Sequence, residues 1–71
     1  MAFDYSKLKG KITELFGTRD KFAQKLGIAP NTLSLKLNGK GEFSQGEIAK
    51  MSDVLQIDKQ DIPTYFFTKI V

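Results

Sequence analysis

The sequence predicts a single all-α domain of five short helices. Apolar residues recur at three- and four-residue spacing, as in Leu8, Ile12, Leu15 and Phe16. Glycines, prolines and helix-capping residues separate these stretches. A chain of 71 residues has room for one domain. We therefore expect one compact domain over residues 1–71, with its core at about residues 5–67 and a short apolar C-terminal tail at residues 64–71.

The first helix is expected from about Asp4 to Phe16. Gly10 lies inside this periodic pattern, where glycine costs about 1 kcal/mol of helix stability relative to alanine. Close packing against a neighbouring element would explain Gly10. Gly17 is expected to end the helix.

Residues 18–40, TRDKFAQKLGIAPNTLSLKLNGK, predict two helices joined by a tight glycine turn. Thr18 is suited to cap the second helix, and Gly27 supplies the left-handed backbone that ends it. Ala23 is small enough for the two helices to approach closely, while Leu33 anchors the third helix in the core. The third helix is expected to begin near Pro30 and to end at Asn38-Gly39.

The fourth helix has the clearest start signal of the chain. Ser44 followed by Glu47 forms a capping box, which predicts a helix to about Leu55 with a buried stripe of Ile48, Met51 and Leu55.

The fifth helix is expected to follow Asp58 and to cover Lys59 to about Ile62, where Pro63 interrupts or restarts the chain. The closing TYFFTKIV is too apolar for a solvated tail. It is expected to form either a final helical turn or an extended edge strand.

Composition excludes several classes of chemistry. The sequence contains no cysteine and no histidine, which removes disulfides, thiolate nucleophiles, zinc fingers and imidazole bases. Clustered carboxylates and a glycine-rich phosphate loop are also missing. We therefore predict that the chain is not an enzyme, with no catalytic residues, no metal site and no cofactor. No apolar run approaches the roughly 18 residues of a membrane span, so we expect a cytoplasmic protein with no membrane partner.

Charge is divided unevenly along the chain. Residues 1–40 hold eight basic and three acidic side chains, a net charge of +5, whereas residues 41–71 hold three basic and five acidic side chains, a net charge of −2. This polarity suits N-terminal helices that face a polyanion. Alternatively, the lysines are an ordinary solvated surface.

Several residues together carry a resemblance to a known family. They are Phe22, Ala23, Leu26, Gly27, Ile28, Leu33 and Asn38-Gly39-Lys40. The chain resembles a lambda-repressor-like, Cro-type helix-turn-helix domain over about residues 5–67. The segments DYSKLKGKI, SLKLNGK and YFF further resemble small regulators encoded by phages and prophages of Gram-positive bacteria. The resemblance implies a helix-turn-helix at the second and third helices and binding to double-stranded DNA.

Helical geometry indicates which residues of the third helix would face a major groove. With Leu33 and Leu37 buried, the opposite side and its flanks carry the candidate base readers Asn31, Ser34, Leu35, Thr32 and Pro30. Asn31 is the best candidate, because a carboxamide can pair bidentately with adenine. Alternatively, Asn31 caps its own backbone, and Leu35 packs beneath the loop that follows.

Phosphate contacts are expected at the edges of the two-helix segment. The candidates are Thr18, Arg19, Lys36, Asn38 and Lys40. Ala29 and Pro30 depart from the family, which commonly has a serine cap and a polar reader at these positions. One subunit would therefore make few base contacts, and specific binding would require two half-sites.

The C-terminal tail is the candidate for an interface with a second copy or another partner. Phe66 is expected to complete the core, whereas Tyr65, Phe67, Ile70 and Val71 are the candidate interface residues.

Two functions fit the sequence. In the first, the chain is a Cro-like or repressor-like transcriptional regulator that binds an operator as a homodimer. In the second, it is a phage modulator or antirepressor, a helix-turn-helix scaffold that binds a larger phage repressor protein through the C-terminal aromatic residues or the third helix.

Overall fold

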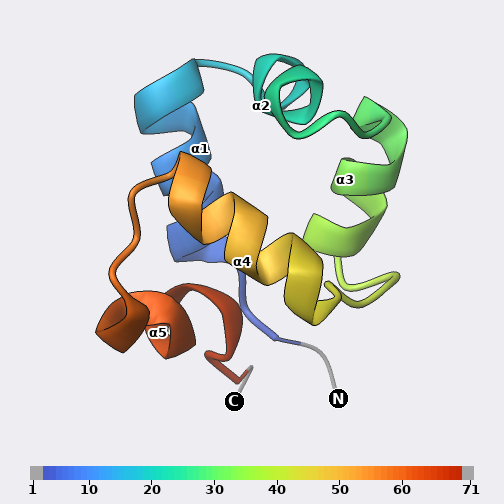
Figure 1. Ribbon diagram of the computed structural model, residues 1–71. Coiled ribbons are helices and arrows are strands. Elements are labelled where there is room, and N and C mark those ends of the chain that lie inside the picture. Colours follow the sequence, from blue (N-terminus) through green and yellow to red (C-terminus); the bar gives the residue numbers. More distant parts are fainter. Residues whose placement is uncertain (1–2, 70–71) are drawn as a thin grey trace.

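A computed structural model of the chain describes residues 3–69 and confirms the predicted all-α class. Its helices are α1 (Ser6–Phe16), α2 (Arg19–Leu26), α3 (Pro30–Leu37), α4 (Gln45–Val54) and α5 (Ile62–Phe66), with a 3-10 turn, η1, at Lys59–Asp61. Figure 1 shows α4 crossing the centre of the molecule, with α2 above it, α3 to one side and α5 below. No helix within residues 3–69 is long and apolar enough to cross a membrane.

One hydrophobic core joins the helices. Five of its side chains come from α2 and α3, so the two-helix segment is held from inside the domain. The core consists of Tyr5, Leu8, Ile12, Phe22, Ala23, Leu26, Leu33, Leu37, Met51, Leu55 and Phe66. Ile48, which we predicted to be buried, is only half-buried at the edge of this core.

Helix α1 begins at Ser6, two residues later than predicted. The Asp4 carboxylate accepts hydrogen bonds from the backbone N–H and the hydroxyl of Ser6, and these bonds keep Asp4 outside the helix. The expectation of close packing at Gly10 is wrong, because a Cβ atom built there would meet nothing within 4 Å. Nothing in the structure explains this glycine.

Both ends of α2, and the turn from α2 to α3, have the predicted geometry. The Thr18 hydroxyl accepts a hydrogen bond from the Lys21 backbone N–H at 3.2 Å and so caps α2. Gly27 has a φ of 78°, and the N–H groups of Gly27 and Ile28 both donate to the carbonyl of Ala23, at 2.9 and 3.1 Å. Ala23 has no exposed surface, which agrees with its predicted place at the helix crossing.

Helix α4 begins with the predicted capping box. The Ser44 hydroxyl accepts from the Glu47 N–H at 3.1 Å, and the Glu47 carboxylate accepts from the Ser44 N–H at 2.8 Å. The helix ends at Val54, one residue before the predicted end. This firm start fixes the end of α4 that lies nearest to α3.

The C-terminal region differs from the prediction. Lys59–Asp61 form a 3-10 turn, and Pro63 lies in the first turn of α5, where its missing N–H leaves no helical bond unmade. Of the two predicted alternatives the tail forms the helical turn, and within residues 3–69 the edge strand is reduced to an isolated antiparallel bridge between Phe3 and Lys69. The tail continues as α5 to Phe66, and an extended stretch follows in which the Asp4 N–H donates to the Thr68 carbonyl at 2.7 Å.

Candidate interaction surface

Helix α3 is buried on one side and open on the other. Leu33 and Leu37 face the core, as predicted. At its start, Ala29 has an extended backbone and caps no helical N–H through its side chain, and Pro30 lies at the beginning of the helix. Helix α3 therefore begins without a side-chain cap.

The predicted base readers lie largely where helical geometry placed them. Pro30, Asn31 and Thr32 are exposed, and Ser34 is half-buried. Leu35 is 46% exposed, so the alternative that it packs beneath the following loop is wrong. The backbone makes that contact instead, because the Lys40 N–H donates to the Leu35 carbonyl at 2.9 Å.

Lys36 is engaged by α4. Its Nζ donates to Oε1 and Oε2 of Glu47 at 2.8 and 2.6 Å, and Oε1 also accepts from the Ser44 N–H. The hydrogen bond from Lys36 is the main reason that the pKa of the Glu47 carboxyl lies below its ordinary value, and the Ser44 N–H acts in the same direction. The Lys36 charge is thus compensated within the domain, although we predicted it as a phosphate contact.

The other predicted phosphate contacts do not form one cluster. The Thr18 hydroxyl is used as the cap of α2, and Arg19 beside it is half-buried. Asn38 and Lys40 are exposed in the loop after α3. In Figure 1 the start of α2 and this loop lie at opposite ends of the α2–α3 unit.

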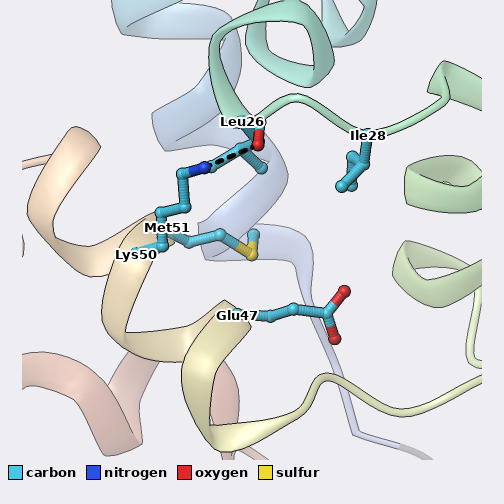
Figure 2. A pocket seen from close by; sticks show the side chains of 5 residues that line it. All are labelled: Leu26, Ile28, Glu47, Lys50 and Met51. Atoms are coloured by element: carbon cyan, nitrogen blue, oxygen red, sulfur yellow. Dashed lines mark hydrogen bonds between the residues drawn. The ribbon is translucent and has the colours of Figure 1, made fainter.

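A second lysine ties the two-helix unit to α4. Lys50 Nζ donates to the carbonyl of Leu26 at 2.8 Å, at the C-terminal end of α2, where the helix dipole favours a cation. Figure 2 shows this bond beside a small gap that Ile28 points into and that Met51 helps to line. The gap holds about 30 Å³, the share of one water molecule in the liquid, and is a packing defect rather than a ligand site.

Neither lysine contact could be recognised in the sequence. Glu47 was recognised only as part of a capping box, and Lys36 lies eleven residues before it. The two side chains become neighbours only because the loop after α3 brings α4 back against that helix. The distance in sequence between Lys50 and the end of α2 likewise gives no indication of a contact.

The predicted C-terminal interface is only partly available. Tyr65 is half-buried and packs against the core, so it is a poorer interface candidate than we expected. Phe66 is buried, as predicted, and Phe67 is 47% exposed. Phe67 contacts Phe3 edge to face, with ring centroids 5.8 Å apart. Ile70 and Val71 lie outside the described residues.

Comparison with known proteins identifies relatives of the whole chain. The structure is similar to the solution structure of the modulator of repression (MOR) of the temperate bacteriophage TP901-1 from Lactococcus lactis. The two share 49% sequence identity with a TM-score of 0.83, and the match covers 100% of this chain and 97% of the other. No curated protein sequence gave a match.

The sequence also matches a family profile described as "Protein of unknown function (DUF739)" over residues 1–69. This family has no assigned function, so the Cro-type resemblance stays a prediction. The match covers nearly the whole chain, and the protein belongs to the DUF739 family.

Proposed function

We propose that this protein is a modulator of repression that acts by binding a phage repressor protein. The observation that carries the proposal is the full-length similarity, at 49% identity, to a protein described as a phage modulator of repression. This is the second of the two functions considered from the sequence. It involves no catalytic step and no cofactor.

The open side of α3 supports a protein partner. Its exposed residues are uncharged, and the one lysine of the helix is paired with Glu47. DNA affinity depends on cations that are free to reach phosphates. The central part of a protein interface, in contrast, is depleted in charged residues.

Leu35 is the natural anchor of such an interface. It is a large apolar side chain, 46% exposed, on a helix whose other side is fixed in the core. Pro30, Asn31 and Thr32 lie near it on the same helix and are exposed. A rigid helix that presents an apolar anchor with uncharged polar neighbours is a common form of helix-mediated binding.

Calorimetric titration of the repressor protein encoded by the same phage tests this proposal. We expect the wild-type chain to bind and Leu35→Ala to weaken binding at least about tenfold, as for a central interface residue. The matched control is Leu15→Ala, which removes an equally exposed leucine from α1. No binding by the wild-type chain would contradict the proposal, and equal losses in both variants would contradict the assignment to α3.

Operator binding is the second candidate function, and two observations favour it. Asn31 is exposed on α3, and Arg19 lies at the start of α2 within the basic half of the chain. This function also requires a homodimer, for which Phe67 offers the exposed apolar surface. If it is correct, Asn31→Ala should weaken operator binding by about 1–3 kcal/mol and change the base preference.

A further inference from the structure

Aromatic side chains line a hollow in the surface of the domain. The volume of this hollow is about 130 Å³. Segments from four parts of the chain build it: the residues before α1, the loop after α3, α4 and the end of α5. Its lining consists of Phe3, Tyr5, Glu42, Phe43, Ile48, Phe66 and Phe67.

The five rings pack against one another, mostly edge to face. Tyr5 and Phe43 pack edge to face with centroids 5.3 Å apart, and Phe43 and Phe66 do so at 5.9 Å. On the other side, Phe3 packs edge to face on Phe67. Because edge-to-face pairs turn one ring across another, such a cluster presents electron-rich faces as well as edges to its surroundings.

Glu42 brings a negative charge to this hollow. Its side chain is exposed, and it takes part in neither of the two ion pairs found within residues 3–69. The carboxylate lies close enough to Tyr5 for its charge to raise the pKa of the phenol, after the larger effect of burial. Aromatic faces together with a carboxylate attract a cation.

The size of the hollow limits its occupant. A volume of about 130 Å³ suits the end of one side chain. A nucleobase could also stack on the rings, but the Glu42 carboxylate would repel the phosphates attached to it. A planar guanidinium group both stacks on aromatic rings and pairs with a carboxylate.

We propose that this hollow binds an arginine side chain of a protein partner, between the aromatic rings and the carboxylate of Glu42. The identity of that partner as the repressor rests on the proposed function. The recognition of arginine does not, because it follows from the rings and the carboxylate alone.

The first experiment uses N-acetyl-arginine amide as the probe, followed by NMR of the aromatic signals of the chain. The matched control ligand is N-acetyl-citrulline amide, which has a similar shape without the charge. We expect the arginine probe to shift the signals of Tyr5, Phe43 and Phe67 saturably, with a Kd at least about fivefold lower than that of citrulline. In Glu42→Gln the preference for arginine should shrink, because only the aromatic rings remain to attract its charge.

Three results would overturn the inference. They are the absence of a saturable shift at these rings, equal binding of arginine and citrulline by the wild-type chain, and a preference for arginine that is undiminished in Glu42→Gln. Adenosine serves as a further probe, and stronger shifts with adenosine than with arginine would identify a nucleobase site instead.

The second experiment separates this inference from the proposed function. Repressor binding is measured calorimetrically for the wild-type chain, for Glu42→Gln and for Glu14→Gln, an equal change of charge on α1. We expect about fivefold weaker binding for Glu42→Gln and unchanged binding for Glu14→Gln. Failure of the wild-type chain to bind contradicts the proposed function. Binding that is equal in all three chains contradicts the role of the hollow in the repressor complex.

Discussion

The α2–α3 unit and the aromatic hollow are both open surfaces, but they are built in different ways. The first comes from one continuous segment, residues 18–40, in which local bonds fix the start of α2 at Thr18 and the turn after it at Gly27. The second is assembled from four separate parts of the chain. Local sequence patterns thus specify a scaffold well, whereas a binding surface can depend on contacts between distant segments.

The two surfaces also differ in charge. The open side of α3 carries no uncompensated charge, because Lys36 pairs with Glu47. The hollow combines aromatic rings with the exposed carboxylate of Glu42. Neither arrangement provides the cluster of free cations that a phosphate backbone requires. Both surfaces therefore favour a protein partner.

The largest expected effect distinguishes two adjacent rings at the hollow. Phe66 is 1% exposed and belongs to the core, so Phe66→Ala should cost about 3–5 kcal/mol of unfolding free energy, most of the stability of a domain this small. Phe67 is 47% exposed, and Phe67→Ala should cost less than about 1 kcal/mol. Urea unfolding followed by circular dichroism measures both values. Similar losses would show that the Phe67 ring is part of the core.

A second pair of variants tests the scaffold of the α2–α3 unit. Gly27 has a φ of 78°, so Gly27→Ala should destabilise the domain by about 1–2 kcal/mol through backbone strain alone, since its Cβ would meet nothing. Gly10 lies inside α1 with open space around it, and Gly10→Ala should stabilise the domain by about 1 kcal/mol. Thermal unfolding shows whether each variant is less or more stable than the wild-type chain. A loss at Gly10 would reveal a need for glycine there that the structure does not show.

The smallest expected effect concerns the Lys36–Glu47 pair. The ordinary pKa of Glu47 is 4.5, and the folded domain lowers it. The pair therefore stabilises the domain above about pH 4.5, and this contribution is lost as the pH falls through the folded pKa. Lys36→Met should remove about 1 kcal/mol at pH 7 and flatten this acid dependence.

The control for that titration is the Lys11–Glu14 pair on α1. Its nitrogen and oxygen are 4.0 Å apart, and the Glu14 side chain is largely exposed. Lys11→Met should leave both the stability and its pH dependence nearly unchanged. Urea unfolding at several pH values between 3 and 7 checks both pairs. An equal response of the two variants would mean that Lys36 is not held by Glu47 in solution.

The sequence predicted those features that depend on neighbouring residues. The cap at Thr18, the left-handed turn at Gly27 and the capping box at Ser44 each involve residues within four positions of one another, and all three are present. The fifth helix was predicted too early in the chain, because a proline such as Pro63 is compatible both with the end of a helix and with the first turn of the next one.

The sequence could not predict contacts between distant residues. We predicted a phosphate contact for Lys36 because it flanks the third helix, whereas its partner on α4 becomes adjacent only after folding. The aromatic residues of the tail suggested an interface, but nothing indicated that Phe3, Phe43 and Glu42 would join them around one hollow. These contacts support a protein partner, in addition to the full-length similarity to a phage modulator of repression.

Sedimentation velocity tests most directly the claim that the partner is a repressor protein. The chain is mixed separately with the repressor encoded by the same phage and with that phage's operator DNA. We predict that the chain sediments with the repressor in the absence of DNA, and that operator DNA alone leaves its sedimentation unchanged. Sedimentation with the operator DNA and not with the repressor would contradict the account.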